Sequence, residues 1–233
     1  GSVHNGLSGL KKDNRGYNLD QLLVGAEGTL GVITAVALRL VPAVASRAVA
    51  WAGVESPERA LGLLRFVEDR SRNIEGFELV SGDSLQLVLK HIPGTRPPLA
   101  DDHAWHVLIE ATTSDGGWDV VEELEQLLAA AIRSGLADDA VIAASEAQAE
   151  AFWRIRDSIS EAERTEGPTL AHDVSVPVSE MPNFIVDASR AVEKKFPGVI
   201  ASAFGHLGDG NIHFHVRAGS HTAPDWYDRE GPA

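Results

Sequence analysis

The sequence Val199-Ile-Ala-Ser-Ala-Phe-Gly-His-Leu-Gly-Asp-Gly-Asn-Ile-His-Phe-His-Val-Arg217 has the pattern of a β-hairpin. Two runs that favour strands flank a glycine-rich centre, Leu207-Gly-Asp-Gly210. Asp-Gly is a favoured two-residue hairpin turn, because both residues tolerate the positive φ angles of a type I′ turn. We therefore expect a tight turn at Asp209-Gly210 between antiparallel strands over 199–206 and 211–217.

This turn predicts which histidines of the hairpin share a face. With Asp209-Gly210 at the turn, His206 lies directly opposite His213, with Cβ atoms roughly 4.5–5.5 Å apart. His215 points to the same side, because it follows His213 by two residues on the strand. From the residues alone, two interpretations remain open: a pair of structural histidines, or two ligands of a divalent cation.

The hairpin ends a longer alternation of strands and amphipathic helices that begins near residue 46. Further strands are expected at 49–54, 105–111, 141–144 and 169–176, and helices at 56–70, 118–133, 145–164 and 179–196. The order of these elements predicts an α+β fold, in which helices cover one face of an antiparallel sheet in a ferredoxin-like arrangement.

The first 45 residues have a different texture. Gly25-Ala-Glu-Gly-Thr-Leu-Gly31 holds three glycines in seven residues, and Val32–Val41 reads as a strand that Pro42 ends. The turn lacks the Walker sequence and the Rossmann spacing. It is either a tight turn before a strand or a turn whose backbone approaches a ligand closely. A segment this short buries too little surface to fold alone.

Composition excludes several classes of function. The 233 residues are 44% hydrophobic and 23% charged, which is typical of a globular chain with a sizeable core. A net charge of −14 disfavours binding to duplex nucleic acid. The absence of cysteine excludes disulfides, thiolate nucleophiles and cysteine-ligated clusters. We expect a cytoplasmic location, with peripheral association with a membrane as the alternative.

Three motifs of the first segment carry a resemblance to a known family. Asp13-Asn-Arg-Gly-Tyr-Asn-Leu19, Leu23-Val-Gly-Ala-Glu-Gly-Thr-Leu-Gly-Val-Ile-Thr34 and Leu38-Arg-Leu-Val-Pro42 resemble the end of the FAD-binding domain in the vanillyl-alcohol-oxidase-type flavoproteins. The branch they resemble contains the D-lactate, glycolate and D-2-hydroxyglutarate dehydrogenases. The resemblance implies that FAD is contacted by Asn14, Gly25, Glu27, Gly28, Thr29, Gly31, Val32 and Ile33.

The resemblance also implies a division into domains. Residues 3–45 correspond to the C-terminal end of the FAD-binding domain, and residues 46–233 to the C-terminal cap domain of FAD-linked oxidases, truncated at its C-terminus. The pyrophosphate-binding loop upstream and a Glu-His-Gly segment downstream are absent from the sequence. We therefore expect a fragment of a longer enzyme that is inactive by itself.

Arg156 and Ser160 are spaced as an i, i+4 pair at the edge of the apolar stripe of the expected helix 145–164. By sequence alone, Arg156 is better interpreted as paired with Asp157, Glu161 or Glu163 on a solvated face. The family resemblance instead implies that Arg156, Ser160 and His215 contact the substrate. Two positions depart from the family: His215, where relatives often have Asn, and Ala171, where many have Lys.

For His206 and His213, the resemblance implies a role as ligands of a divalent metal, for which we expect zinc. The third ligand, a Glu, and the catalytic base, a His, belong to the absent downstream segment. The catalytic residue itself is therefore not among the 233 residues.

The implied function is an FAD-dependent dehydrogenase that oxidises a small D-2-hydroxy acid to the 2-oxo acid by hydride transfer to flavin. A quinone or an electron-transfer protein would accept the electrons, and a homodimer is a further expectation. Two alternatives belong to other classes. The chain can be a non-catalytic cap fragment that binds a metal or an acid, or an acidic module that docks a partner subunit.

Overall fold

A computed structural model describes residues 1–14, 16–219 and 225–230, and divides the chain into two units, 1–43 and 44–233. In the first unit, the part of the chain that is described contains one regular element, the 3-10 helix η1 (Leu19–Leu22). The assignment of residues 3–45 to an FAD-binding domain stays a prediction.

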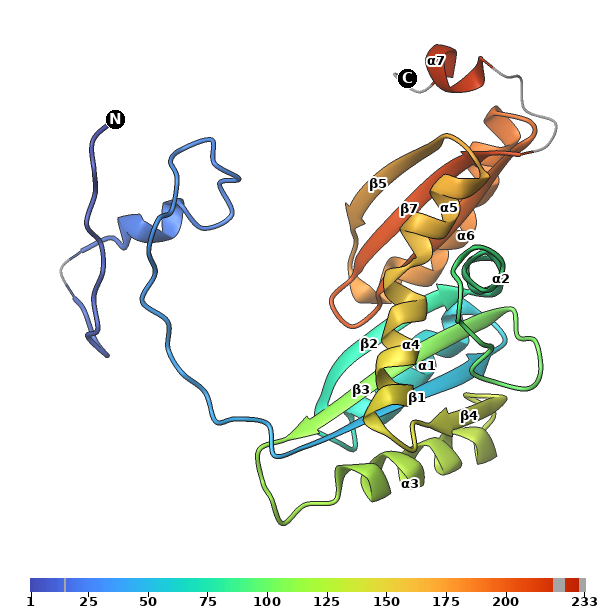
Figure 1. Ribbon diagram of the computed structural model, residues 1–233, viewed down its shortest axis with the longest axis horizontal. Coiled ribbons are helices and arrows are strands. Elements are labelled where there is room, and N and C mark those ends of the chain that lie inside the picture. The colour runs from blue at the N-terminus through green and yellow to red at the C-terminus, as the bar shows by residue number, and fades with distance from the viewer. Residues whose placement is uncertain (15, 220–224, 231–233) are drawn as a thin grey trace. The chain divides into compact units, whose positions relative to one another are not determined.

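The second unit is built on a seven-stranded sheet with the strand order β4-β1-β3-β2-β6-β7-β5 (Figure 1). Each neighbouring pair of strands is antiparallel. The strands are β1 (Ser46–Val54), β2 (Ile74–Ser81), β3 (Trp105–Thr113), β4 (Asp139–Ile142), β5 (Thr169–Ser175), β6 (Val199–His206) and β7 (Asn211–Ala218).

Helices pack on both faces of this sheet. They are α1 (Pro57–Glu68), α2 (Gly82–His91), α3 (Val120–Arg133), α4 (Glu146–Asp157), α5 (Ile159–Glu166), α6 (Met181–Lys195) and α7 (Trp226–Glu230), with the 3-10 helix η2 (Val178–Glu180) before α6. None of the described helices is long and apolar enough to cross a membrane.

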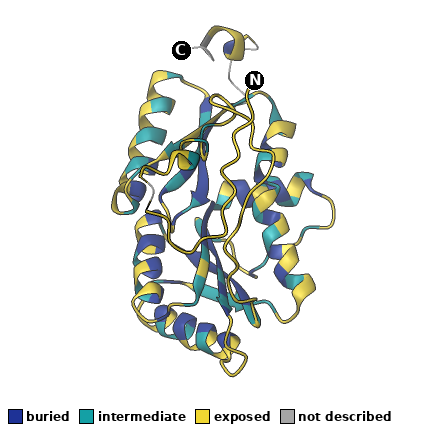
Figure 2. Ribbon diagram, turned by 90° about the vertical axis from the view of Figure 1, so that its left-hand side faces the viewer, coloured by how far each residue is buried: buried dark blue, intermediate teal, exposed yellow. Residues whose placement is uncertain are grey.

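Strand β1 shows how the two faces are filled. Its residues Ala50 and Ala52 join one hydrophobic core with α1, α3 and α6, whereas Val49 and Trp51 join a second core with α2, α4 and α5. Figure 2 shows the buried residues along the strands and on the sheet-facing sides of the helices. The α+β antiparallel fold is confirmed, with a second helical layer beyond the single face expected.

Capping residues explain where several helices begin. The Ser56 side chain accepts from the backbone N–H of Arg59 before α1, and Ser145 accepts from that of Gln148 before α4. The helix expected from residue 179 begins two residues later. Ser179 lies inside η2, and α6 starts at Met181 without a side-chain cap.

Two further expectations are corrected. The helix expected over 145–164 is broken at Ser158, so that α4 packs on β1 and β3 while α5 packs on α2. The strand expected over Val32–Val41 does not form. A strand must pair its N–H and C=O groups with a neighbour, and no strand exists among the described residues of the first unit.

Candidate active site

The hairpin β6–β7 turns through four residues, Leu207–Gly210, not through the predicted two. The backbone N–H groups of Asp209 and Gly210 both donate to the carbonyl of His206, at 3.3 and 3.0 Å. His206 is therefore paired with Asn211, not with His213 as predicted. A register shift of two residues keeps each side chain on its face, so the three histidines still share one face.

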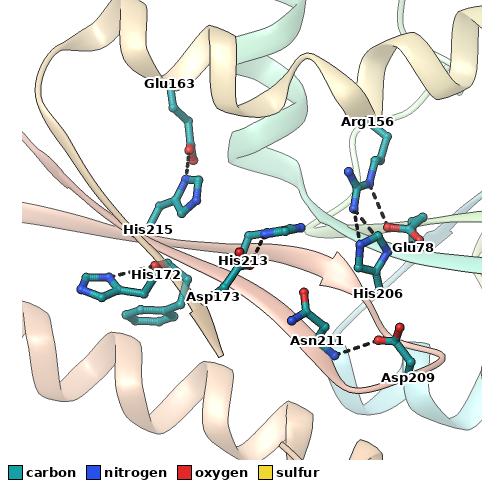
Figure 3. A network of polar contacts seen from close by, with 11 residues as sticks. Glu78, Arg156, Glu163, His172, Asp173, His206, Asp209, Asn211, His213 and His215 are labelled. Atoms are coloured by element: carbon teal, nitrogen blue, oxygen red, sulfur yellow. Dashed lines mark hydrogen bonds and ion pairs between the residues drawn. The ribbon is translucent and has the colours of Figure 1, made fainter. Parts of the chain in front are cut away.

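On that face the histidine rings form a row (Figure 3). The ring centroids of His206 and His213 are 5.5 Å apart, and those of His213 and His215 are 6.4 Å apart. A metal–nitrogen bond of about 2.1 Å places a ring centroid roughly 3.2 Å from the ion. His206 and His213 can therefore share an ion with bent geometry, whereas His213 and His215 could do so only in a straight line.

Each ring is held through Nδ1 by a different carboxylate. The contacts are His206 to Glu78 (2.7 Å), His213 to Asp173 (2.6 Å) and His215 to Glu163 (2.5 Å). Such partners fix the orientation and tautomer of an imidazole and leave Nε2 for a ligand. In the part of the chain that is described, no group of three or more histidine and acidic side chains is placed to hold one ion.

Arg156 points from α4 into this row, not into solvent. Its Nε donates to Oε2 of Glu78 at 2.8 Å, and one terminal nitrogen lies 3.2 and 3.4 Å from the ring nitrogens of His206. Of the acids expected on a solvated face, only Asp157 contacts it, at 3.6 Å. The Arg156 side chain is 13% exposed, so it forms part of the site.

No hydrogen bond among the described residues joins Ser160 to Arg156. The break at Ser158 ends α4 between them, so they are not an i, i+4 pair within one helix. Ser160 is half-buried, and its hydroxyl has no hydrogen bond to any residue that the structure describes. Its role in substrate binding stays a prediction, like those of Arg156 and His215.

Burial lowers the pKa of His213 below its ordinary value. Repulsion from Arg156 and from His206 acts in the same direction, while Asp173 opposes it. The neutral imidazole is the form that binds a metal ion. The environment of His213 therefore favours the ligating form.

The sequence analysis missed two acids of the site. Glu78 is 4% exposed and lies between the buried residues Phe77 and Leu79 of β2. Glu163 is fully buried and continues the apolar stripe that runs from Ile155 on α4 to Ile159 on α5. A lone charge within a buried strand or stripe was the signal available in the sequence.

The predicted FAD contacts lie in the first unit, described here by itself. Apart from Asn14, they fall in or just after a tight turn in which Gly25, Glu27 and Gly28 have positive φ angles of 79°, 49° and 78°. Nothing lies within 4 Å of where a Cβ of Gly25 or Gly28 would stand. Such an open backbone suits close approach of a ligand.

Residues 44–228 match the family model described as FAD linked oxidases, C-terminal domain. The chain belongs to this family. It is 35% identical over 228 residues to the mitochondrial D-2-hydroxyglutarate dehydrogenase of Arabidopsis thaliana, covering 95% of this chain and 39% of that protein. The rat mitochondrial enzyme of the same name is 33% identical, with 94% and 40% covered.

Two other proteins resemble this FAD-linked oxidase domain. A putative mitochondrial D-lactate dehydrogenase of Schizosaccharomyces pombe is 32% identical, with 93% and 43% covered. The solved structure of an alkyldihydroxyacetonephosphate synthase shares the fold at a TM-score of 0.56 and 15% identity, covering 91% of this chain and 44% of that one. The chain thus spans about two fifths of the length of the curated relatives it matches.

The family resemblance read from the sequence is confirmed by these matches. The expected cytoplasmic location is wrong, because the names of these relatives place them in mitochondria.

Proposed function

We propose that the complete protein is an FAD-dependent dehydrogenase that oxidises a D-2-hydroxy acid to the 2-oxo acid. The names of the relatives support this class of reaction. The observation that carries it is the position of Arg156, whose guanidinium lies within 3.4 Å of the ring nitrogens of His206. This arrangement places a carboxylate-binding group beside an imidazole that can orient the neighbouring hydroxyl.

In this proposal, Arg156 binds the substrate carboxylate, and Ser160 and His215 contact the rest of the acid. Bound FAD would supply the hydride acceptor, and its proposed contacts are those of Asn14 and of the segment 25–33. The positive φ angles and open backbone of that segment support its part in the proposal. A quinone or an electron-transfer protein would reoxidise the flavin.

The residues of the row also fit a divalent cation. His206 and His213 would hold it through Nε2, because each Nδ1 is already bonded to a carboxylate. The guanidinium of Arg156, which lies 3.2 Å from Nε2 of His206, would have to move away from that atom. The ion would supply Lewis acidity that lowers the pKa of a hydroxyl bound beside it. Imidazole suits zinc among other ions, and two such ligands need a third for a strong site.

Anaerobic mixing of the full-length protein with single 2-hydroxy acids tests the proposal. D-Lactate, glycolate and D-2-hydroxyglutarate are offered in turn, with the L-enantiomers of the chiral acids as controls. Bleaching of the flavin by at least one of the three, with the matching 2-oxo acid formed, is the expected result. A flavin that stays oxidised with every acid would overturn the proposed reaction.

A further inference from the structure

Glu163 and His215 form an enclosed carboxylate–imidazole pair at one end of the histidine row. Oε2 of Glu163 lies 2.5 Å from Nδ1 of His215. The Glu163 side chain is fully buried, and that of His215 is 7% exposed. The two residues come from different elements, α5 and β7, so the fold brings them together (Figure 3).

Burying this pair stabilises the fold less than burying apolar side chains in the same space would. The second oxygen of Glu163, Oε1, is buried and has no hydrogen-bond partner among the described residues. Leaving a buried carboxylate oxygen unpaired destabilises a fold, and an apolar pair of similar volume is commonly as stable or more so. The presence of a carboxylate at this buried position therefore indicates a task that an apolar residue would not perform.

The surroundings of His215 leave one nitrogen for that task. Phe204 packs edge-on against the ring, with centroids 5.0 Å apart, so that Glu163 and Phe204 together restrain it. Nε2 has no hydrogen-bond partner and is not among the buried unpartnered atoms of the described chain. Ala171, the cross-strand partner of His215 on β5, is exposed and carries only a methyl group, which leaves room beside the ring.

The place of the pair in the row indicates what the free nitrogen contacts. Arg156 and His206 lie at one end, His213 lies between, and His215 lies at the other end (Figure 3). The separation of 6.4 Å between the His213 and His215 rings is too large for a shared, bent metal site. A ligand held by Arg156 and extending along the row would direct its far end toward His215.

We propose that Glu163 is a positioning residue that fixes the ring of His215, so that Nε2 hydrogen-bonds a polar substituent of the 2-hydroxy acid remote from Arg156. The inference rests on the proposed function and adds a determinant of specificity to it. His215 is the contact residue, and Glu163 acts only through it.

The test compares Glu163→Gln, His215→Phe and the double variant in the full-length, flavin-loaded enzyme. Each is assayed with D-lactate, whose side chain is a methyl group, and with D-malate and D-2-hydroxyglutarate, whose side chains end in a carboxylate. We expect Glu163→Gln to raise KM for the two dicarboxylates about 10- to 100-fold. KM for D-lactate and kcat for all three acids should change less than threefold.

Two comparisons separate positioning from loss of structure. Because Glu163 acts through the ring nitrogen, the double variant should match His215→Phe and show no additive loss. Glu110→Gln is the matched control. The Glu110 carboxylate lies on β3 of the same sheet and accepts from Arg47 and Trp153, outside the row. Glu110→Gln should lower thermal stability without changing the ratio of KM values.

Equal changes in KM for all three acids, or additive effects in the double variant, would overturn the inference and leave the proposed reaction standing. Wild-type protein that oxidises neither dicarboxylate would overturn the inference alone, whereas protein that oxidises none of the three acids and no glycolate would overturn the proposed reaction as well. If Glu163→Gln does not fold, His215→Phe alone decides, since this ring has no hydrogen-bonding nitrogen and unchanged discrimination there contradicts the contact.

Discussion

Glu78 and His206 face each other across the β2–β6 pair and are joined by a hydrogen bond of 2.7 Å between Oε1 and Nδ1. The other oxygen of Glu78 accepts from Nε of Arg156 at 2.8 Å. One buried carboxylate therefore orients both the cation and the imidazole at this end of the row. Arg156 on α4 and His206 on β6 share no backbone pairing, so this shared carboxylate links the two elements at the site.

We predict that Glu78→Gln lowers kcat/KM of the full-length enzyme about 10- to 100-fold, because an amide cannot accept from both neighbours with two oxygens. The free energy of unfolding should fall by about 1–3 kcal/mol, since a buried partner is lost. Steady-state kinetics and denaturant unfolding measure the two effects.

Glu110→Gln is the control for Glu78→Gln, because the Glu110 carboxylate also accepts from an arginine, Arg47, and from a ring N–H, that of Trp153. The control should lose stability to a similar extent and keep its kcat/KM. A Glu78→Gln enzyme as active as the wild type would show that Arg156 and His206 hold their positions without this carboxylate.

For Arg156→Lys we expect a loss of roughly 2–5 kcal/mol in transition-state stabilisation with 2-hydroxy acids. Lysine keeps the charge but lacks the planar fork that binds a carboxylate with two parallel hydrogen bonds. The measurement is kcat/KM in the full-length enzyme. Arg154→Lys is the matched control, because Arg154 lies in the same helix and donates to the carbonyl of Pro93, outside the row. Equal kinetics for the two variants would remove Arg156 from the site.

The sequence predicted the antiparallel α+β fold because its strands and helices carry strong local patterns. It misplaced features that depend on neighbours far along the chain. The register of the hairpin follows from pairing with β2 and β5, not from the Asp209-Gly210 turn signal alone. The helix break at Ser158 reflects packing on two different surfaces, which the continuous apolar stripe does not reveal.

The candidate site was predictable in part for a related reason. Side chains alternate between the two faces of a strand, so a register shift of two residues leaves each side chain on its face. The shared face of the three histidines was therefore predicted correctly. The acids that hold the rings come from three other elements, and their contacts follow only from the sheet order. Arg156 was placed by family resemblance, because local spacing alone favoured a solvated face.

The metal proposal predicts a specific pH dependence. Burial lowers the pKa of His213, so this ring stays neutral to a lower pH than free imidazole. Uptake of Mn²⁺ or Zn²⁺ by the full-length protein should therefore fall only below about pH 6.5, the ordinary imidazole value. Isothermal titration at several pH values measures the affinity, which His213→Gln should lower at least tenfold.

His172→Gln is the control for His213→Gln, since the His172 ring is hydrogen-bonded to the carbonyl of Phe214, its cross-strand partner on β7. Equal affinity in both variants would contradict the assignment of His213.

His106, outside the site, should make stability depend on pH. Its pKa is lowered to about 4, because burial disfavours the charged form and His103 adds repulsion, while Asp102 opposes the shift. In the unfolded chain the pKa of this imidazole is about 6.5. Between these two values the unfolded state binds more protons, so the free energy of unfolding rises with pH and levels off above about 6.5.

Acidification from pH 7 to pH 4 should therefore lower the free energy of unfolding by about 3 kcal/mol through His106. The difference in denaturant unfolding between the wild-type protein and His106→Phe isolates the contribution, because the other titrating groups are shared. Parallel pH profiles for the two proteins would show that His106 is as easily protonated in the fold as in the unfolded chain.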